Sequence, residues 1–506
     1  MPERLHLQRG AQVLVAGQRR SNLPTHALAL PLALMALSWT VVPALVHTAP
    51  PLDVAESALW GREWVIGTYK HPGMPAWVFE ISRLFNGGHI GWPAYLAGQL
   101  FNLATLVLTF FLARDLAGAR VATAAVFALF GIEYLSWRSI EFNHTLAQMP
   151  FWVGAAWCAW RAVDRSTLGW WIGLGAMAAA GLYGKLSNAM LLIVIAGWIL
   201  STSRGRASLK SVGPYAGAAT FALLCVPLVH WLIASGFAPL TYAEARGREQ
   251  SLLAMLLFPA NAALQAAPIV MTLALAGFFA RDTQAQPASA ARAPAADRFL
   301  WVMALAPPAL SVALALIGRS GLRASWLAPA LPLMAVLLVS RWPHRLDNAL
   351  LDRLRKIAVA IALVVPLGYG VVISQQRSVG AQPLLRMNWP QAEIARVLSA
   401  AWAQETGRPL RIVTGRAWPA GLVALNHPDR PSILTEGELA FSPWITPERL
   451  AREGTLVVWA DMSNADLTPA MRILIADRPV QEKRFSPPTG AAGPGIVMKY
   501  AVVPPR

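Results

Sequence analysis

The sequence predicts a polytopic α-helical membrane protein with a small α/β domain at its C-terminal end. Of its 506 residues, 56% are hydrophobic and only 14% are charged, and the mean hydropathy is +0.45. Soluble proteins carry roughly 25% charged residues, so most of this chain needs lipid as its solvent. Two further observations support the prediction: a series of long apolar segments, and a change of pattern after residue 374.

About eleven apolar segments reach or approach the roughly 20 residues that a membrane-spanning helix needs. We predict helices at 27–46, 91–113, 121–136, 145–162, 167–184, 187–201, 213–235, 255–280, 299–317, 325–340 and 357–374. The pair 167–184 and 187–201 is nearly one apolar segment, interrupted at Lys185. The membrane domain therefore extends over 27–374, and a short segment, 1–26, precedes it.

Basic residues fall mainly in alternate connections between these segments, and this distribution sets the orientation in the membrane. The connections rich in them contain Arg4, Arg9, Arg19 and Arg20; Arg114 and Arg120; Arg161 and Arg165; Arg204, Arg206 and Lys210; Arg281, Arg292 and Arg298; and Arg341, Arg345, Arg353, Arg355 and Lys356. The positive-inside rule predicts that these connections and the N-terminus are cytoplasmic. The formal net charge of +17 is then a feature of topology, and nucleic acid is not an expected partner.

The odd number of helices places the tail, 375–506, on the outer side together with the connections 48–90, 137–144, the turn at Lys185, 236–254 and 318–324. In the long first loop, residues 54–64 and 75–86 carry apolar side chains at helical spacing. We expect both segments to be helices that lie in the membrane interface, within the periplasmic loop 48–90.

The tail changes to a pattern of short apolar strands and amphipathic helices. We predict a helix at 390–406, with Asn388 as its N-cap and Gly407 just past its end. Strands are expected at 410–414, 431–435, 455–460 and 499–503, and helices at 418–426, 446–453 and 466–476. No Gly-rich phosphate loop opens any of these helices, so we expect an accessory α/β domain without chemistry of its own.

The first outer loop offers the strongest candidates for chemistry. Asp53 and Glu56 are three residues apart and would share one face of a helix. Tyr69, Lys70 and His71 follow in the same loop, directly before a proline. A simpler explanation of the two acids is an N-terminal cap with a first-turn glutamate.

The second outer loop is short, so its polar residues lie at the mouth of the helices that carry the first loop. It contains Arg138, Glu141, Asn143 and His144. Glu141 and His144 could bind a divalent metal ion beside Asp53 or Glu56, because carboxylate and imidazole suit several metals. The alternative is an interfacial ion pair between Arg138 and Glu141.

Several cationic residues lie in connections that we predict to be on the outer side, where the positive-inside rule predicts few of them. A function in binding would explain their presence there. Lys185 lies between two apolar segments, where a lysine is a functional candidate or snorkels toward the interface. Later outer loops contain Tyr242, Arg246, Arg248, Arg323 and Trp326. Recognition of a phosphate would explain the arginines, and solvated loop charge is the alternative.

These features predict a polar site at the outer membrane surface that transfers a group from a lipid-linked phosphate. Three other classes stay open: a transporter or lipid flippase, an oligosaccharide ligase or polymerase that uses a lipid carrier, and a non-catalytic scaffold of the cell envelope. Transporters tend to have internal repeats and binding residues near the midplane. Here most helices lack charge, with Glu133 and His230 as exceptions.

The ordered motifs of residues 50–200 resemble those of bacterial glycosyltransferases of the dolichyl-phosphate-mannose protein mannosyltransferase superfamily, including the aminoarabinose transferases that modify lipid A. The motifs are Asp53-Val-Ala-Glu56, Trp60-Gly-Arg-Glu-Trp64, Tyr69-Lys70-His71-Pro72, Glu141-Phe-Asn-His144 with Pro150-Phe-Trp152, and Gly184-Lys185-Leu-Ser187. The resemblance implies a GT-C fold in a bacterial inner membrane, a site that faces the periplasm, and a polyprenyl-phosphate-linked sugar as donor. It also implies a periplasmic lipid, glycan or protein as acceptor.

The resemblance also implies roles for individual residues. Asp53 matches the proposed base, and Glu141 matches an acid often placed at the metal or donor site. Val54 and Gly73 depart from the commonest pattern, in which an acid follows the aspartate and a second proline follows His-Pro. These departures bear on metal coordination and on the acceptor.

The complete set of predicted site residues has four groups. They are the catalytic acids Asp53, Glu56 and Glu141; the donor-phosphate cations Lys70, Arg138, Lys185, Arg246, Arg248 and Arg323; the sugar or acceptor contacts Tyr69, His71, Asn143, His144, Tyr242 and Trp326; and, for a divalent metal ion, Glu56, Glu141 and His144.

Overall fold

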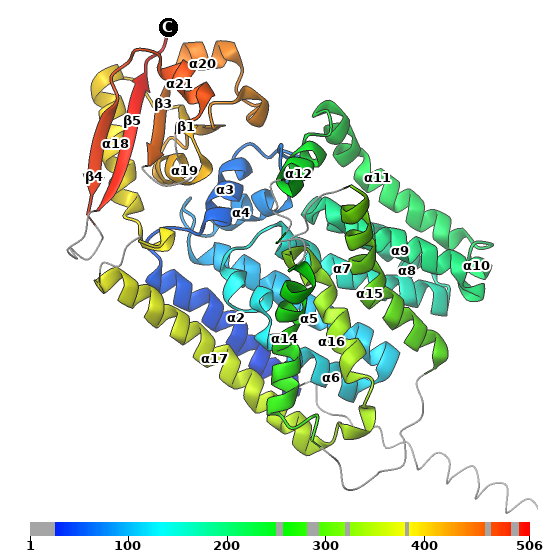
Figure 1. Cartoon of the computed structure of the whole chain (residues 1–506). Helices are drawn as coiled ribbons and strands as arrows, with labels where there is room; N and C mark the ends of the chain where they lie inside the picture. The colour runs from blue at the N-terminus through cyan, green and yellow to red at the C-terminus, as the bar shows by residue number, and fades with distance from the viewer. Residues whose placement is uncertain are drawn as a thin grey trace, which may run out of the picture.

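Apolar helices packed side by side form the larger part of the computed structural model, and an α/β domain caps one end of them (Figure 1). The structure describes residues 26–248, 253, 257–280, 293–318, 324–379, 384–460, 467–486 and 495–506. All but the last residue of the predicted cytoplasmic segment 1–26 lies outside these ranges.

Every predicted apolar segment overlaps a helix. These helices are α2 (His26–Val46), α5 (Trp92–Ala117), α6 (Ala119–Ala128), α7 (His144–Arg165), α8 (Leu168–Gly184), α9 (Ala189–Ser201), α11 (Val212–Ala234), α14 (Phe258–Leu275), α15 (Pro294–Ile317), α16 (Leu331–Val339) and α17 (Asn348–Val379). Among the described residues, five helices are long and apolar enough to cross a membrane: those at 27–46, 92–117, 212–234, 294–317 and 348–377. The total of eleven crossings therefore stays a prediction.

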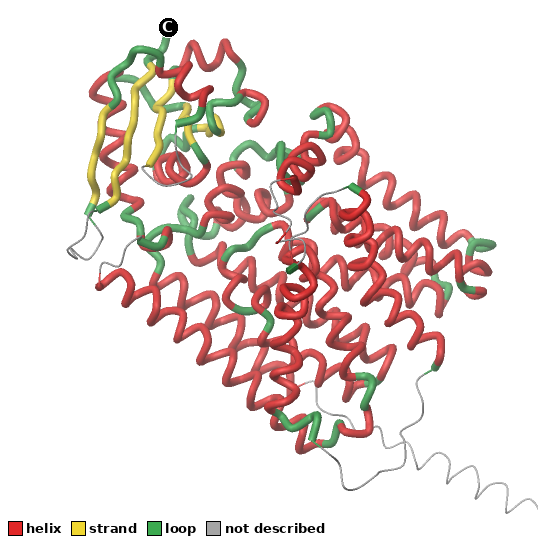
Figure 2. Tube along the Cα trace, in the orientation of Figure 1, coloured by secondary structure: helices red, strands yellow, loops and turns green. Residues whose placement is uncertain are grey.

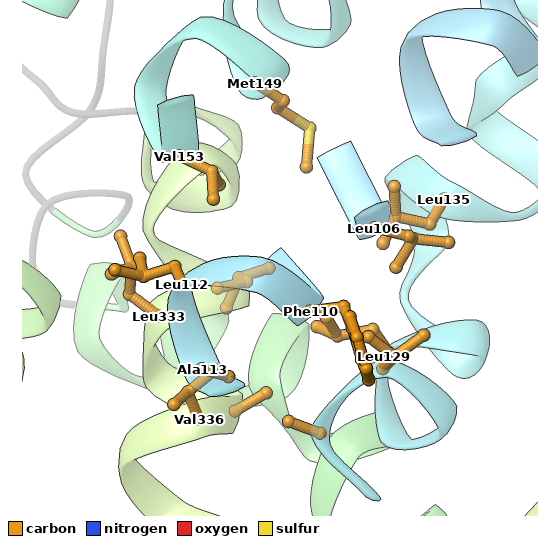
Figure 3. Packing of buried hydrophobic residues seen from close by; sticks show 14 of the residues in the cluster. Leu106, Phe110, Leu112, Ala113, Leu129, Leu135, Met149, Val153, Leu333 and Val336 are labelled. Atoms are coloured by element: carbon orange, nitrogen blue, oxygen red, sulfur yellow. The ribbon is translucent and has the colours of Figure 1, made fainter. Parts of the chain in front are cut away.

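The bundle is held by close packing of small and branched side chains. Helix α2 lies along α17, α7 packs on α8, and α8 packs on α11. A Cβ on Gly175 of α8 would meet the Gly217 carbonyl oxygen of α11 at 2.2 Å, so the two backbones approach as small residues allow. Figure 3 shows Leu112 of α5 beside Leu333 of α16, both buried.

The prediction of one helix through 121–136 is wrong at its end. Helix α6 stops at Ala128, and short 3₁₀ turns follow: η1 (Leu129–Gly131), η2 (Glu133–Leu135) and η3 (Trp137–Ile140). Glu133 therefore lies in a turn and forms an ion pair with Arg138, with 3.3 Å between Glu133 Oε2 and Arg138 Nε. It is not an acid inside a membrane helix.

Three short helices gather at one end of the bundle: α3 (Leu52–Gly61), α4 (Met74–Leu84) and α12 (Ala238–Arg248). At the far end of α11 from α12 lies α10 (Ser203–Ser208), in one of the basic connections (Figure 1). The remaining 3₁₀ turns are η4 (Leu186–Asn188), η5 (Ala324–Ala330), η6 (Pro343–Arg345), η7 (Arg386–Asn388) and η8 (Leu439–Phe441).

The two helices of the first loop differ in what they cover. Helix α4 exposes apolar side chains at its end, with Leu84 71% and Phe85 70% accessible, as a helix at a membrane interface would. Helix α3 is buried instead: Val54 packs in the bundle core, and Leu59 packs in the core of the C-terminal domain. The expectation that α3 lies in the interface is therefore wrong, because two protein surfaces enclose it.

The described strands all lie in the C-terminal domain (Figure 2). Its elements are α18 (Gln391–Thr406), β1 (Ile412–Gly415), α19 (Ala417–Asn426), β2 (Ser432–Thr435), α20 (Pro447–Glu453), β3 (Thr455–Ala460), α21 (Pro469–Ile475), β4 (Gln481–Phe485) and β5 (Ile496–Val503). The sheet order is β2-β1-β3-β5-β4. Strand β1 is parallel to β2 and β3, with Val413 opposite Ile433 and Leu456, and β5 is antiparallel to β3 and β4.

Two sequence predictions for this domain need correction. Strand β4 was not predicted, because its residues Gln481–Arg484 are polar and exposed at the sheet edge. The N-cap of α18 is Pro390 rather than Asn388. The Asn388 side chain instead donates to the Ile373 carbonyl and to Gln376 Oε1, which fixes the linker to α17. Gly407 ends the helix with φ +61°, as predicted.

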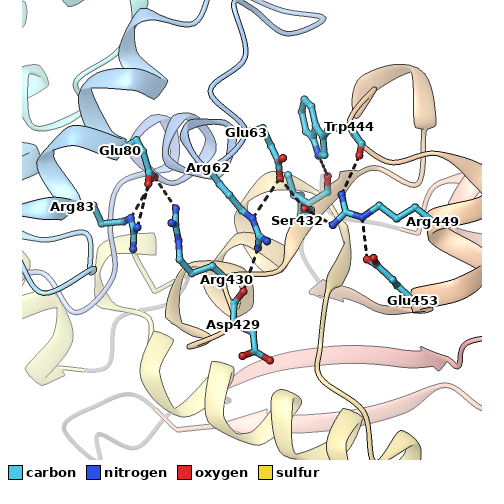
Figure 4. A network of polar contacts seen from close by, with 11 residues as sticks. Arg62, Glu63, Glu80, Arg83, Asp429, Arg430, Ser432, Trp444, Arg449 and Glu453 are labelled. Carbon is cyan, nitrogen blue, oxygen red and sulfur yellow. Dashed lines mark hydrogen bonds and ion pairs between the residues drawn. The ribbon is translucent and has the colours of Figure 1, made fainter.

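Polar contacts join the C-terminal domain to the first loop (Figure 4). Arg430 pairs with Glu80 of α4 at 2.7 Å, and Ser432 donates to Glu63 Oε1 at 2.8 Å. Beneath them, Leu59 of α3 contacts Gly421 of α19. This combination of apolar and charged contacts holds the domain directly over the first loop.

Candidate active site

The two acids of α3 have different partners. Helix α3 begins after Pro51, whose extended backbone serves as N-cap, and Asp53 lies in its first turn. Asp53 Oδ2 accepts a hydrogen bond of 2.9 Å from Asn143 Nδ2. Glu56 Oε1 pairs with Lys70 Nζ at 2.5 Å. The capping explanation of the acids is not supported, since no side chain caps α3.

Asn143 donates to Asp53 and is also the N-cap of α7. Its Oδ1 accepts from the backbone N–H groups of Thr145 at 3.0 Å and Leu146 at 3.3 Å. These bonds orient the amide so that its NH₂ group points at Asp53. The sequence Asn-His-Thr thus starts a helix and fixes a carboxylate at the same point.

The start of α7 joins three parts of the site through consecutive residues. Asn143 bonds Asp53, the His144 ring lies 4.2 Å from the His71 ring, and Thr145 Oγ1 accepts from Lys185 Nζ at 3.0 Å. His144 Nε2 lies 3.0 Å from the Pro72 carbonyl oxygen. Residues from four separate segments therefore converge at one helix end.

Glu141 lies two residues before Asn143, and its carboxyl has a strongly raised pKa. Burial raises its pKa to about 7; the Asp53 charge also raises it, while Arg138 and Arg386 lower it. The effect of the Asp53 charge on Glu141 means that the two acids lie near each other. A carboxyl with a pKa near 7 can hold or release a proton at physiological pH.

Lys70 is enclosed by aromatic rings. Its Nζ lies 5.4 Å from the centre of the Tyr69 ring and 5.6 Å from that of Tyr242 on α12. Tyr69 in turn stacks on Phe441 with ring centres 4.0 Å apart. Burial is the largest influence and lowers the pKa of Lys70, but Glu56, Tyr69 and Tyr242 together raise it above its ordinary value, so Lys70 stays charged.

Burial also decides the charge of the histidine next to this pair. The pKa of His71 is well below its ordinary value, first because the ring is buried and then because His144, Lys185 and Lys70 lie near it. His71 is therefore neutral at physiological pH and acts as a hydrogen-bonding ring. Lys70 and Lys185 are two positive charges that lower the pKa of His71.

Several predicted cations lie elsewhere or outside the described residues. Arg138 pairs with Glu133 rather than with Glu141, so the predicted Arg138–Glu141 pair is wrong. Arg246 lies one turn after Tyr242 on α12. The side chain of Arg248 and all of Arg323 fall outside the described residues. Trp326, in η5, faces Lys185, whose Nζ is 5.8 Å from its ring.

The predicted metal ligands are not brought together. Lys70 neutralises Glu56, and His144 Nε2 is occupied by the Pro72 carbonyl. Among the described residues, no three histidine, cysteine or acidic side chains form a group that could hold a metal ion. The predicted metal site of Glu56, Glu141 and His144 is therefore wrong.

Three residues near the site were missed from the sequence. Arg386 comes from the linker after α17 and influences Glu141, and its guanidinium lies 5.9 Å from the Trp418 ring. Glu436 and Phe441 come from the C-terminal domain: the charge of Glu436 slightly raises the pKa of Glu56, and the Phe441 ring stacks on Tyr69. Only the packing of the tail on α3 brings them here, and no local pattern signals that packing.

Fold and site together define a membrane-embedded helical protein whose acids, lysines and aromatic rings converge at one end of the bundle. Residues 70–231 match the family model of the dolichyl-phosphate-mannose-protein mannosyltransferases. This confirms the resemblance to that superfamily, and the matched range contains the motifs from Lys70 onward, whereas Asp53 and Glu56 precede it. No curated protein matches the chain significantly in sequence.

The whole fold is similar to that of ArnT from Cupriavidus metallidurans. The ArnT structure with bound undecaprenyl phosphate aligns with 15% identity and a TM-score of 0.57, over 94% of this chain and 98% of that one. The apo structure of ArnT gives a TM-score of 0.59 over the same shares, again with 15% identity. The chain therefore shares the fold of these structures along nearly its full length.

Proposed function

We propose that this protein is an inner-membrane glycosyltransferase that moves a sugar from a polyprenyl-phosphate-linked donor to a periplasmic lipid, glycan or protein acceptor. The observation that carries the proposal is the start of α7, where consecutive residues contact Asp53, His71 and Lys185. A carboxylate and a fixed cation within one site are what transfer from a sugar phosphate needs.

The donor phosphate is best accommodated near Lys185. The side chain of Lys185 is oriented by Thr145 and lies against Trp326, next to the start of α7. A lysine at this position compensates the charge that develops on a leaving phosphate. The likeness to a protein solved with undecaprenyl phosphate supports a polyprenyl carrier for that phosphate.

Asp53 is the proposed base. As the acceptor hydroxyl oxygen attacks C1 of the sugar, Asp53 takes the hydroxyl proton and the C1–O bond to phosphate breaks. The electron pair of that bond leaves with the phosphate, which remains on its lipid carrier. Attack opposite the leaving group inverts C1. The Asn143 amide holds Asp53 in place and leaves its second oxygen for the proton.

The proposed orientation follows from the basic connections. The helix α10 with Arg204 and Arg206 lies at the other end of α11 from α12 and the site. By the positive-inside rule that end faces the cytoplasm, and the site and the C-terminal domain face the periplasm.

Transfer by the purified protein in detergent, without any gradient, tests the proposal. We expect labelled sugar to move from a polyprenyl-phosphate sugar fraction to an envelope lipid and glycan extract. A transporter or flippase cannot perform this step. The variant Asp53→Asn should be inactive, and Asp477→Asn, which changes an exposed aspartate of the C-terminal domain, is its control. Full activity of Asp53→Asn would reject the base assignment.

A second variant tests the proposed role of Lys185 in binding the donor phosphate. In Lys185→Ala we expect the Michaelis constant for the donor to rise by about 10-fold, with a smaller change in kcat. An unchanged donor constant would contradict the role of Lys185.

A further inference from the structure

A cavity of about 220 Å³ lies at the end of the bundle away from the candidate active site. Its walls come from the last turns of α7, the turn between α9 and α10, and the first turns of α15. Helix α10 lies at the far end of α11 from α12 (Figure 1), so this cavity is separate from the acids and lysines described above. No residue of the candidate active site lines it.

Two arginines from different helices line the cavity. Among the residues that the structure describes, neither an ion pair nor a hydrogen bond engages Arg298 of α15. Arg204 of α10 lies 3.5 Å from Asp164 of α7, and both side chains are exposed. An ion pair this exposed contributes little to stability, so the Arg204 guanidinium stays available to a ligand. With two arginines and one acid, the lining carries a net positive charge.

The turn between α9 and α10 is fixed by an arginine outside the cavity. Arg206 Nη1 donates to the carbonyl oxygens of Leu200 and Ser201, at 3.1 Å each. The next residue to line the cavity with a free hydroxyl is Ser203, which has no hydrogen-bond partner within the described part of the chain. The cavity therefore presents guanidinium and hydroxyl donors on a fixed backbone, a combination that suits phosphate oxygens.

Aromatic side chains place the cavity at the membrane surface. Trp160 and Trp198 line it, and both rings pack on Phe299, with ring centres 5.2 and 4.7 Å away. Tryptophan is enriched where a membrane protein passes from hydrocarbon to water. Helix α15 is long and apolar enough to cross the membrane, and Arg298 lies in its second turn. The two arginines therefore lie at the level of the lipid headgroups.

An exposed apolar face continues from Arg298 along α15. Trp301 and Leu305 follow it at spacings of three and seven residues, which places all three on one side of the helix, and both apolar side chains are exposed. A cationic group at the headgroup level with an apolar face next to it matches a phospholipid, which has a phosphate and acyl chains in the same order. A soluble anion would contact the arginines but would leave the apolar face bare.

We infer that this cavity binds the headgroup of an anionic phospholipid, with Arg204 and Arg298 on the phosphate and the acyl chains along Trp301 and Leu305. Basic pockets between membrane helices bind lipid headgroups in this way. The net positive charge of the lining favours an anionic over a zwitterionic headgroup. The inference goes beyond the proposed transfer reaction and does not depend on it. In the orientation proposed above, the lipid belongs to the cytoplasmic leaflet.

Binding of phosphatidylglycerol to the purified full-length protein in detergent tests the inference, with native mass spectrometry to count bound lipid. We expect Arg298→Gln to raise the dissociation constant about 10-fold, and the double variant Arg204→Gln with Arg298→Gln to raise it further. Arg165→Gln is the matched control, because Arg165 is an exposed arginine at the end of α7 that does not line the cavity. It should bind phosphatidylglycerol as the wild type does.

Two further probes identify the ligand class. Phosphatidylcholine should bind more weakly than phosphatidylglycerol and should be indifferent to Arg298→Gln, and inorganic phosphate at equal concentration should not displace the lipid. Equal phosphatidylglycerol binding by the wild type and the double variant would overturn the inference. Equal binding of the two lipids would show that the headgroup charge is not recognised, and displacement by inorganic phosphate would assign the cavity to a soluble anion; either result would overturn it as well.

Discussion

Asp53 and Glu56 lie one turn apart on α3, yet their surroundings differ completely. Asp53 receives a neutral amide, Asn143, and lies near a second acid, Glu141. Glu56 is paired with Lys70, which two tyrosine rings surround. The Asn143 amide brings no charge to Asp53, whereas the Lys70 ammonium compensates the charge of Glu56. We therefore expect the two acids to have different roles.

The largest effect should follow from removing the proposed base. Asp53→Asn keeps the shape of the side chain and an acceptor for the Asn143 amide, so the fold should persist. General-base catalysis contributes roughly 10²–10⁴ in rate, and we expect a loss of about 10³ in kcat. Steady-state transfer assays with thermal unfolding as the folding control measure this. If Glu56→Gln lowers kcat by a comparable factor without loss of stability, the two acids do not differ in role.

Breaking the ion pair should instead destabilise the protein. Lys70→Met leaves the Glu56 carboxylate without its partner in a site where both side chains are no more than 20% accessible. Such uncompensated charges cost about 3 kcal/mol of unfolding free energy. The double variant Glu56→Gln with Lys70→Met should recover much of the loss, because neither charge remains. Thermal unfolding of the single and double variants measures the two stabilities. If the double variant is no more stable than Lys70→Met, the pair has no structural role.

Asn143→Ser separates the two tasks of the helix cap. Serine caps helices about as well as asparagine, but it lacks the NH₂ group that Asp53 accepts from. We expect transfer to fall by about 10- to 30-fold, a loss of about 2 kcal/mol of transition-state stabilisation, with a nearly unchanged melting temperature. If Asn143→Ser lowers the melting temperature as far as Asn143→Ala does but keeps its activity, Asn143 only caps α7 and does not contribute to catalysis.

The smallest effect concerns the pH dependence of stability. The pKa of Glu141 rises from 4.5 to about 7, so the folded state binds a proton that the unfolded state releases between these values. This stabilisation is present below pH 4.5 and is lost as the pH rises to about 7. Glu141→Gln should therefore raise the stability at pH 8 relative to wild type, by about 1 to 2 kcal/mol after allowance for solvent screening, and change little at pH 4.5. An equal difference at both pH values would show that Glu141 titrates normally.

Hydropathy predicted the positions of the bundle helices because a bilayer leaves the backbone no alternative to a helix. It could not give the end of α6 at Ala128, since the 3₁₀ turns that follow are nearly as apolar as the helix. It also missed β4, whose polar residues form an edge strand only through pairing with β5. Both errors arise where tertiary contacts, rather than local composition, decide the conformation.

The candidate site was predictable where it is built from neighbouring loops. Asp53, Lys70, Asn143 and Lys185 do converge, because connections on one side of a bundle necessarily meet. Partners across the fold were not predictable. Arg138 pairs with Glu133 instead of Glu141 because η2 and η3 turn the chain back on itself. Glu436 and Phe441 arrive only through the docking of the last domain of the chain.

Helix α3 is shared between two cores, and this has a consequence for biogenesis. Val54 and Ala58 face the bundle, while Ala55 and Leu59 face the C-terminal domain. The helix that carries both acids therefore cannot complete its packing until the C-terminal domain has folded against it. A chain that lacks this domain would hold an incompletely packed α3, so we expect the candidate site to form only after the domain has docked.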